Sequence, residues 1–179
     1  MRTDRKTAIV LIDVQGKLAE IMYESDKMLN NLEILIKGAQ LLDIPIIWTE
    51  QLPDKLGATI EKISKLLDSQ DPIIKNEFSC VKNVEFSSFI KNKKYNHFLL
   101  CGIETHVCVC QTAKDLLTLG HEVEIIIDGV SSRTELNKNI GIEKITSLGA
   151  MVISVEMLLF EKQEIAVGKE FRELIKIIK

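Results

Sequence analysis

Short apolar runs recur along the chain and are separated by longer amphipathic stretches. The first run, residues 8–13 (AIVLID), is continuously apolar up to its final aspartate, which is typical of a strand covered on both faces of a parallel sheet. Four further runs have this character, at residues 45–49, 97–103, 123–128 and 150–154, and a shorter run at 72–75 is a candidate sixth strand. The pattern therefore predicts about six strands.

The stretches between these runs carry the spacing of helices. Between residues 29 and 42, apolar side chains return every three or four positions, which predicts a helix with one buried face. The same spacing predicts helices over 60–67, 84–90, 107–119, 136–148 and 164–179. Strands that alternate with helices are joined by right-handed crossovers and lie parallel. We therefore expect an α/β fold, a three-layer α/β/α sandwich around a Rossmann-like, mainly parallel sheet.

Composition adds limits on size and partners. The chain has 179 residues, the length of one domain, so residues 1–179 are predicted to form a single domain. A formal net charge of −3 and a pI near 5.7 give no reason to expect nucleic acid or a membrane as partner. The apolar run near the N-terminus is too short for a signal peptide or a membrane span, so the expected location is cytoplasmic. In that reducing compartment the four cysteines are expected to be free thiols.

Reactive side chains stand where the predicted strands end. Ligands of open parallel sheets bind beyond the carboxyl ends of the strands, so these positions are the candidates for a site. They are Asp13 and Gln15 after the first strand, Glu50 and Gln51 after the second, Lys75 at the end of the short run, and Cys108 in the helix that follows residues 97–103. The topology thus predicts that a carboxylate, an amine and a thiol meet at one edge of the sheet.

Cys108 is the candidate nucleophile of this edge. Thr105 is a plausible N-cap, which places Cys108 in the first turn of a helix, where the macrodipole and a nearby lysine are expected to lower the thiol pKa. Cys110, two residues later, is expected to point away into packing. Two alternatives stay open: a buried, inert cysteine, and a zinc site built from Cys101, His106, Cys108 and Cys110, although C-x-C on a helix directs the two sulfurs apart. The other histidines, His97 and His121, are expected to be solvated or lightly packed.

Several motifs of the chain match a known superfamily. They are IVLIDVQ in the first strand, IIKNEFS around Lys75, and GIETHVCVCQTAKDLLTLGHEVEIIIDGVSSRT around Cys108. Over residues 7–160 the chain resembles the isochorismatase-like cysteine hydrolases, which include nicotinamidase and N-carbamoylsarcosine amidohydrolase. The segment WTEQLPDKLGATI is most similar to isochorismatase-domain proteins of poorly defined activity.

The resemblance implies roles for particular residues. Asp13, Lys75 and Cys108 correspond to a catalytic triad in which Asp13 takes the thiol proton, Lys75 holds the charges, and Cys108 attacks a carbonyl carbon to give a thioester. A cis peptide is implied between Ile103 and Glu104, with an oxyanion hole formed by the backbone amides of Glu104 and Cys108.

Departures from the family narrow the expected reaction. Nicotinamidases carry an aspartate and two histidines after the second strand to bind a metal, whereas the segment EQLPDKLGATIEKI contains no histidine. Isochorismatases proper lack the cysteine. We therefore expect a metal-independent cysteine hydrolase without cofactor, which cleaves a C–N amide or similar bond of a small molecule. Its substrate-binding candidates are Gln15, Glu50, Gln51 and Thr105.

Two other functions stay open on the sequence alone. The chain is either such a hydrolase, or a weakly active member that works as an interaction or scaffold protein, or a thiol redox sensor in which Cys101 or Cys110 pairs with Cys108. Oligomerisation is expected in each case, because the family commonly assembles and residues 151–160 offer more apolar surface than one helix needs.

Overall fold

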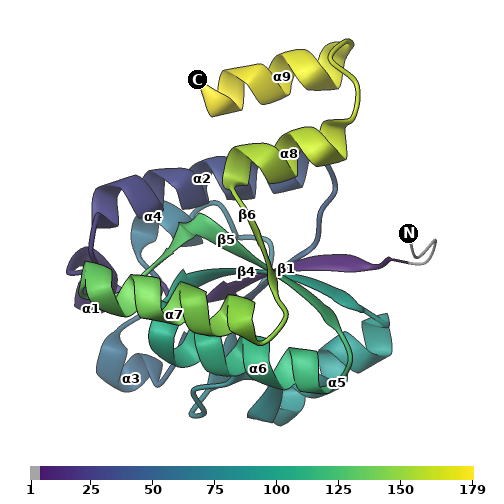
Figure 1. The fold of residues 1–179 in the computed structure, drawn as a ribbon. Helices are drawn as coiled ribbons and strands as arrows, with labels where there is room; N and C mark the ends of the chain where they lie inside the picture. Colours follow the sequence, from purple (N-terminus) through teal and green to yellow (C-terminus); the bar gives the residue numbers. More distant parts are fainter. Residues whose placement is uncertain (1–4) are drawn as a thin grey trace.

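A computed structural model describes residues 5–179, and the first four residues of the predicted domain lie outside the described part. A parallel sheet of six strands in the order β3-β2-β1-β4-β5-β6 runs through its centre (Figure 1). The strands are β1 (Thr7–Ile12), β2 (Ile46–Gln51), β3 (Ile73–Lys75), β4 (His97–Ile103), β5 (Glu122–Ser131) and β6 (Met151–Ile153). The predicted fold class is confirmed, including the short run at 72–75, which forms the edge strand β3.

Helices cover both faces of the sheet. They are α1 (Gly16–Glu20), α2 (Ser25–Leu41), α3 (Pro53–Leu56), α4 (Glu61–Ser64), α5 (Val84–Lys93), α6 (Cys110–Thr118), α7 (Glu135–Ser147), α8 (Val155–Gln163) and α9 (Lys169–Ile178). A 3₁₀ turn, η1 (Cys80–Lys82), precedes α5, and a π-helical turn, η2 (Thr105–Val109), precedes α6. The sequence pattern did not predict α1, α3 or α8. None of the helices within residues 5–179 is long and apolar enough to cross a bilayer.

The core lies in two layers, one on each face of the sheet, because side chains of a strand alternate between its faces. Ile9 and Leu11 of β1 pack with α2, α8 and α9 on one face, and Ala8, Val10 and Ile12 pack with α5 and α6 on the other. Figure 1 shows α2, α8 and α9 stacked on one side of the sheet, with α5, α6 and α7 on the other. Both layers hold the carboxyl ends of the central strands in fixed positions.

The two central strands, β1 and β4, come into close backbone contact beside the carboxyl edge. Gly102 of β4 has φ +103°, and a Cβ placed on it would lie 2.1 Å from the carbonyl oxygen of Ile12. Only glycine fits both this backbone conformation and this space. Gly102 therefore allows β4 to pass close to β1 just before the turn that carries Cys108.

Candidate active site

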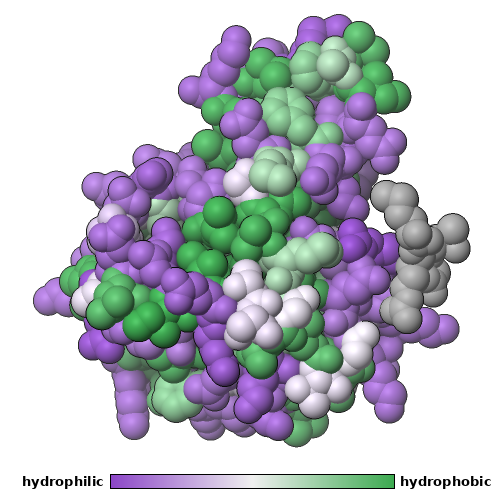
Figure 2. Space-filling view, in the orientation of Figure 1, coloured by the Kyte–Doolittle hydropathy of each residue, from purple (hydrophilic) through white to green (hydrophobic). Residues whose placement is uncertain are grey.

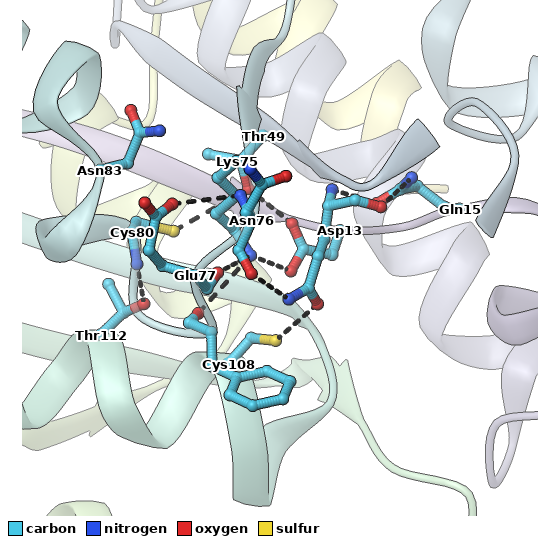
Figure 3. A network of polar contacts seen from close by, with 12 residues as sticks. Asp13, Gln15, Thr49, Lys75, Asn76, Glu77, Cys80, Asn83, Cys108 and Thr112 are labelled. Carbon is cyan, nitrogen blue, oxygen red and sulfur yellow. Dashed lines mark hydrogen bonds and ion pairs between the residues drawn. The ribbon is translucent and has the colours of Figure 1, made fainter. Parts of the chain in front are cut away.

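Four polar side chains meet where the central strands end. Lys75 is the last residue of β3, Gln51 ends β2, Asp13 directly follows β1, and Cys108 lies in η2 after β4. Because β3, β2, β1 and β4 are neighbours in the sheet, these residues come together although up to 95 positions separate them in the sequence. Figure 3 shows Lys75, Asp13 and Cys108 grouped at this edge.

Asp13 and Lys75 form a buried ion pair. The Lys75 Nζ lies 2.5 Å from Asp13 Oδ2, and the two residues are 1% and 2% exposed, respectively. Lys75 also donates to the backbone oxygens of Glu77 (3.0 Å) and Phe78 (3.5 Å). The Thr49 hydroxyl donates to Asp13 Oδ1 at 2.8 Å. Each oxygen of the carboxylate thus has its own donor, which fixes the orientation of the group.

Burial governs the protonation of Asp13. Desolvation raises the pKa of its carboxyl group above the ordinary value of 3.8, and the charge and hydrogen bond of Lys75 offset this effect only in part. A carboxylate with a raised pKa is a better base than an exposed one. Asp13 therefore has the properties of a proton acceptor for a neighbouring group.

Cys108 lies beside this ion pair and is 5% exposed. Its thiol donates to the Gln51 side-chain oxygen over 3.6 Å, and it lies close enough to Asp13 for each group to shift the pKa of the other. The predicted lowering of the thiol pKa is wrong. Burial and the Asp13 carboxylate raise the pKa of Cys108 above the ordinary value of 9.0, and Lys75 opposes them without reversing the sign. The sulfur is therefore a neutral thiol at neutral pH, with a carboxylate next to it.

The turn that carries Cys108 differs from the predicted helix start. Glu104, not Thr105, occupies the N-cap, no side chain caps the turn, and the first five residues form a π-helical turn. The Ile103–Glu104 peptide bond is cis. The Glu104 carboxylate accepts hydrogen bonds from the backbone N–H and Nε of Arg133, which join η2 to the loop after β5. The side-chain oxygen of Thr105 is buried and has no hydrogen-bond partner among the described residues.

Two of the predicted substrate-binding side chains form hydrogen bonds to the neighbouring loop. The Gln15 side chain donates to the backbone oxygens of Gln51 (3.1 Å) and Gly57 (2.6 Å) and accepts from the Gln51 N–H (2.7 Å). The Glu50 carboxylate accepts from the Thr59 N–H at 2.6 Å. Both polar atoms of the Gln15 side chain and the Oε1 atom of Glu50 thus have backbone partners, and these contacts brace the loop between β2 and α4. Gln51 alone of the three directs its side chain at the Cys108 sulfur.

Two residues near the site were not identified from the sequence. Thr49 orients Asp13, and the buried Cys80 lies 3.9 Å from the Thr49 hydroxyl. Burial raises the pKa of Cys80 to about 11, so its thiol is protonated. Thr49 precedes Glu50 at the end of a predicted strand. Only the alternation of successive side chains between the two faces of a sheet could have indicated that Thr49 points at Asp13.

The remaining cysteines and histidines lie apart from this cluster. Cys101 is buried in β4, and its thiol is 3.5 Å from the backbone oxygen of Val10, while Cys110 is half-buried in α6. No group of three possible metal ligands occurs within residues 5–179. The expectation of a lightly packed His97 is wrong, because its ring is buried between Thr7 and Glu124. The ring of His106 is half-buried and contacts the Ser132 hydroxyl at 3.0 Å.

Comparison with known proteins shows to which family the chain belongs. The profile of the family described as "Isochorismatase domain" matches residues 7–157. The chain belongs to the isochorismatase family. The "Secreted isochorismatase effector Isc1" of Phytophthora sojae is 35% identical to this family member over 177 residues, which cover 97% of the chain and 84% of the relative. The resemblance seen in the motifs is confirmed. Because one relative is named as secreted, the cytoplasmic location of this family member stays a prediction.

Solved structures agree with the family assignment. MAR1 ribonuclease from Caenorhabditis elegans has a TM-score of 0.88 at 31% identity and covers 97% of this isochorismatase-family chain and 89% of its own. The ycaC gene product of Escherichia coli, described as an octameric hydrolase of unknown specificity, has a TM-score of 0.89 at 19% identity, with 96% and 87% of the two chains covered. The chain therefore has the α/β fold of isochorismatase-family hydrolases.

Proposed function

We propose that the protein is a metal-independent cysteine hydrolase that cleaves a C–N amide or similar bond of a small molecule. The observation that supports this proposal most strongly is the placement of a neutral, buried thiol beside a carboxylate whose pKa is raised and whose counterion is the buried Lys75. A charged cluster of this kind costs desolvation energy and gives little stability in return, so chemistry is the better reason for its presence.

The reaction proceeds through a thioester. Asp13 accepts the Cys108 proton as the sulfur attacks the carbonyl carbon, and the oxygen of the tetrahedral intermediate is stabilised by the backbone amides of Glu104 and Cys108. The C–N bond then breaks, and Asp13 returns the proton to the departing nitrogen. Water, deprotonated by Asp13, attacks the thioester, releases the carboxylic acid and restores the thiol. Lys75 keeps Asp13 in position and compensates its charge throughout.

The raised pKa of Cys108 determines the order of these events. A free thiolate next to the Asp13 carboxylate is unfavourable, so the proton moves as the S–C bond forms instead of leaving beforehand. The sulfur thus becomes nucleophilic only when an electrophilic carbon is in contact with it.

A small substrate fits the surroundings of the sulfur. The site lies next to the braced loop of Gln15 and Glu50, and Cys108 reaches the surface through only 5% of its area. The C. elegans relative is named a ribonuclease, but a formal net charge of −3 does not favour a polyanionic substrate for this chain.

A screen of small amides, carbamoyl compounds and nitriles tests the proposed activity, with Cys108→Ala as the blank. We expect turnover of at least one compound by the native protein and none by Cys108→Ala or Asp13→Asn. A Cys108→Ser variant that keeps most of the activity would contradict the thioester mechanism. If no compound turns over and Cys108 reacts no faster than a free thiol, the interaction or scaffold role is the better description.

We further propose that the protein forms a homo-oligomer through the β6 side of the sheet. Met151 and Val152 of β6 and Met157 of α8 are 51%, 47% and 53% exposed, whereas Leu158 and Leu159 are buried in the core, so only part of the apolar segment 151–160 is available. Figure 2 shows apolar surface over β6, between α7 and α8. Light scattering should give a mass above the 20.2 kDa of one chain, reduced by Met157→Lys. A monomer at all concentrations would exclude this proposal.

A further inference from the structure

The Gln51 side chain is the polar group nearest to the Cys108 sulfur whose role the proposed mechanism leaves open. Gln51 ends β2, and both its backbone N–H and its backbone oxygen are bound by Gln15. Its main chain is also paired with Lys75 in the register of β2 and β3. These contacts hold the residue between the braced loop and the ion pair, so the position of its side chain is well determined.

The amide of Gln51 has one possible orientation. Its Nε2 donates to the backbone oxygen of Asn76 at 3.3 Å, and a carbonyl oxygen can only accept a hydrogen bond. The amide nitrogen must therefore face Asn76, which turns Oε1 toward Cys108 at 3.6 Å. The group facing the sulfur is a hydrogen-bond acceptor.

The Gln51 Oε1 atom has only a weak hydrogen-bond donor while the Cys108 thiol is protonated, and it loses this donor during the reaction. A thiol is a weak donor, and within residues 5–179 the Cys108 thiol is the partner recorded for Gln51 Oε1. When Asp13 takes the proton, Oε1 is left in an 8% exposed residue facing an electron-rich sulfur. A buried acceptor without a donor is costly, so the site favours a substrate that brings an N–H or O–H to this position.

The groups around the Cys108 sulfur determine which part of the substrate brings this hydrogen to Gln51 Oε1. In the proposed reaction the carbonyl oxygen turns toward the backbone amides at the start of η2, because these are donors. The leaving group then occupies the side lined by acceptors, namely Gln51 Oε1 and the Asp13 carboxylate. A leaving nitrogen with a hydrogen satisfies Oε1, whereas an ester oxygen presents only lone pairs to it.

We propose that Gln51 selects substrates whose leaving group carries an N–H, by accepting that hydrogen on its side-chain oxygen beside the Cys108 sulfur. Primary and monosubstituted amides, ureas and carbamoyl compounds are then cleaved in preference to esters. The atoms balance as in the proposed hydrolysis: the S–C bond forms, the C–N bond breaks, Asp13 passes the thiol proton to the nitrogen, and the amine leaves with its own hydrogens. The inference rests on the proposed function, since it concerns the same sulfur.

Alkylation of Cys108 by two matched probes tests the selectivity without knowledge of the natural substrate. Chloroacetamide and methyl chloroacetate carry an NH₂ or an OCH₃ on the carbonyl group that adjoins the same reactive CH₂ carbon, and each loses chloride when the sulfur attacks this carbon. The rate constants at Cys108 are measured by peptide mass spectrometry and divided by those of N-acetylcysteine. We expect the native protein to favour chloroacetamide by about tenfold or more after this correction.

Variants separate the role of Gln51 from general effects on folding. Gln51→Met keeps the length of the side chain and removes the acceptor, so the corrected preference should fall to about one while the ester still reacts. Gln111→Met, at an exposed position of α6 three residues after Cys108 in the sequence, is the matched control and should keep the native preference. An unfolded fraction would react like N-acetylcysteine and would also move the ratio toward one, so the comparison uses Gln51→Met protein whose circular dichroism spectrum and urea midpoint match those of the native protein.

Each result of this experiment has a definite consequence. A native preference of about one, or an unchanged preference in Gln51→Met, overturns the assignment of Gln51 while the reactivity of Cys108 still supports the hydrolase. If Cys108 reacts with neither probe faster than N-acetylcysteine, the proposed nucleophile is wrong and the selectivity of Gln51 is rejected with it.

Discussion

Replacement of Asp13 by asparagine leaves the buried Lys75 ammonium without its counterion. The two residues are 2% and 1% exposed, and their charges are 2.5 Å apart in the native protein. Loss of one partner from a buried pair costs about 3–5 kcal/mol of unfolding free energy, because the other charge stays desolvated. The asparagine oxygen can still accept the Thr49 hydroxyl, so the loss is attributable to the charge. We expect Asp13→Asn to unfold at a clearly lower urea concentration than the native protein.

The double variant makes this prediction specific. Lys75→Met alone should cost a similar amount, since it leaves the Asp13 carboxylate desolvated without its cation. Asp13→Asn combined with Lys75→Met removes both charges, and such replacements are often neutral or stabilising. The double variant should therefore be more stable than either single variant in urea unfolding followed by circular dichroism, and yet be inactive. Additive losses of stability would refute the desolvated pair, and turnover by the double variant would refute its role in chemistry.

Two further predictions concern the sheet around the site. Gly102→Ala should cost several kcal/mol of stability, because the new methyl group would lie 2.1 Å from the Ile12 carbonyl oxygen. The control Gly120→Ala, at φ +81° with open space around it, should cost about 1 kcal/mol. Equal losses of stability in thermal unfolding would exclude the close approach at Gly102. The hydrogen bond of His97 lowers the pKa of Glu124 below 4.5, so the stability that Glu124 provides is present above that value and is lost as the pH falls through the lowered pKa. Glu124→Gln should therefore destabilise by about 1.5–3 kcal/mol at pH 7 and by less near pH 3, and a pH-independent difference would contradict this assignment.

Most of the fold was predictable because its strands are buried on both faces. The strands that begin near residues 8, 45, 97, 123 and 150 are continuous apolar runs, and this signal is strong for a parallel sheet. Helix α8 was missed because its sequence, VEMLLFEKQ, has apolar residues grouped together instead of spaced along one face. The π-helical turn at Thr105–Val109 was missed because its residues are compatible with an ordinary helix start, and tertiary packing decides between the two.

The sequence also predicted which strand ends would supply Asp13, Lys75 and Cys108, since topology fixes where strand ends meet. It did not predict the sign of the Cys108 pKa shift. That sign depends on how far the thiol is buried and on which charge lies closer, and neither is visible in the local sequence. The commitment of Gln15 and Glu50 to backbone partners likewise depends on the conformation of the loop at residues 52–60.

The pH dependence of Cys108 alkylation tests most directly whether Asp13 activates the sulfur. If Asp13 takes the proton as the bond forms, the rate with chloroacetamide should fall only as the pH drops through the raised pKa of Asp13, above 3.8, and should stay nearly constant from pH 7 to 9. In Asp13→Asn the rate should instead rise by about tenfold for each pH unit in that range, because only a preformed thiolate can react. A native rate that climbs in the same way and is unchanged by Asp13→Asn would contradict the mechanism.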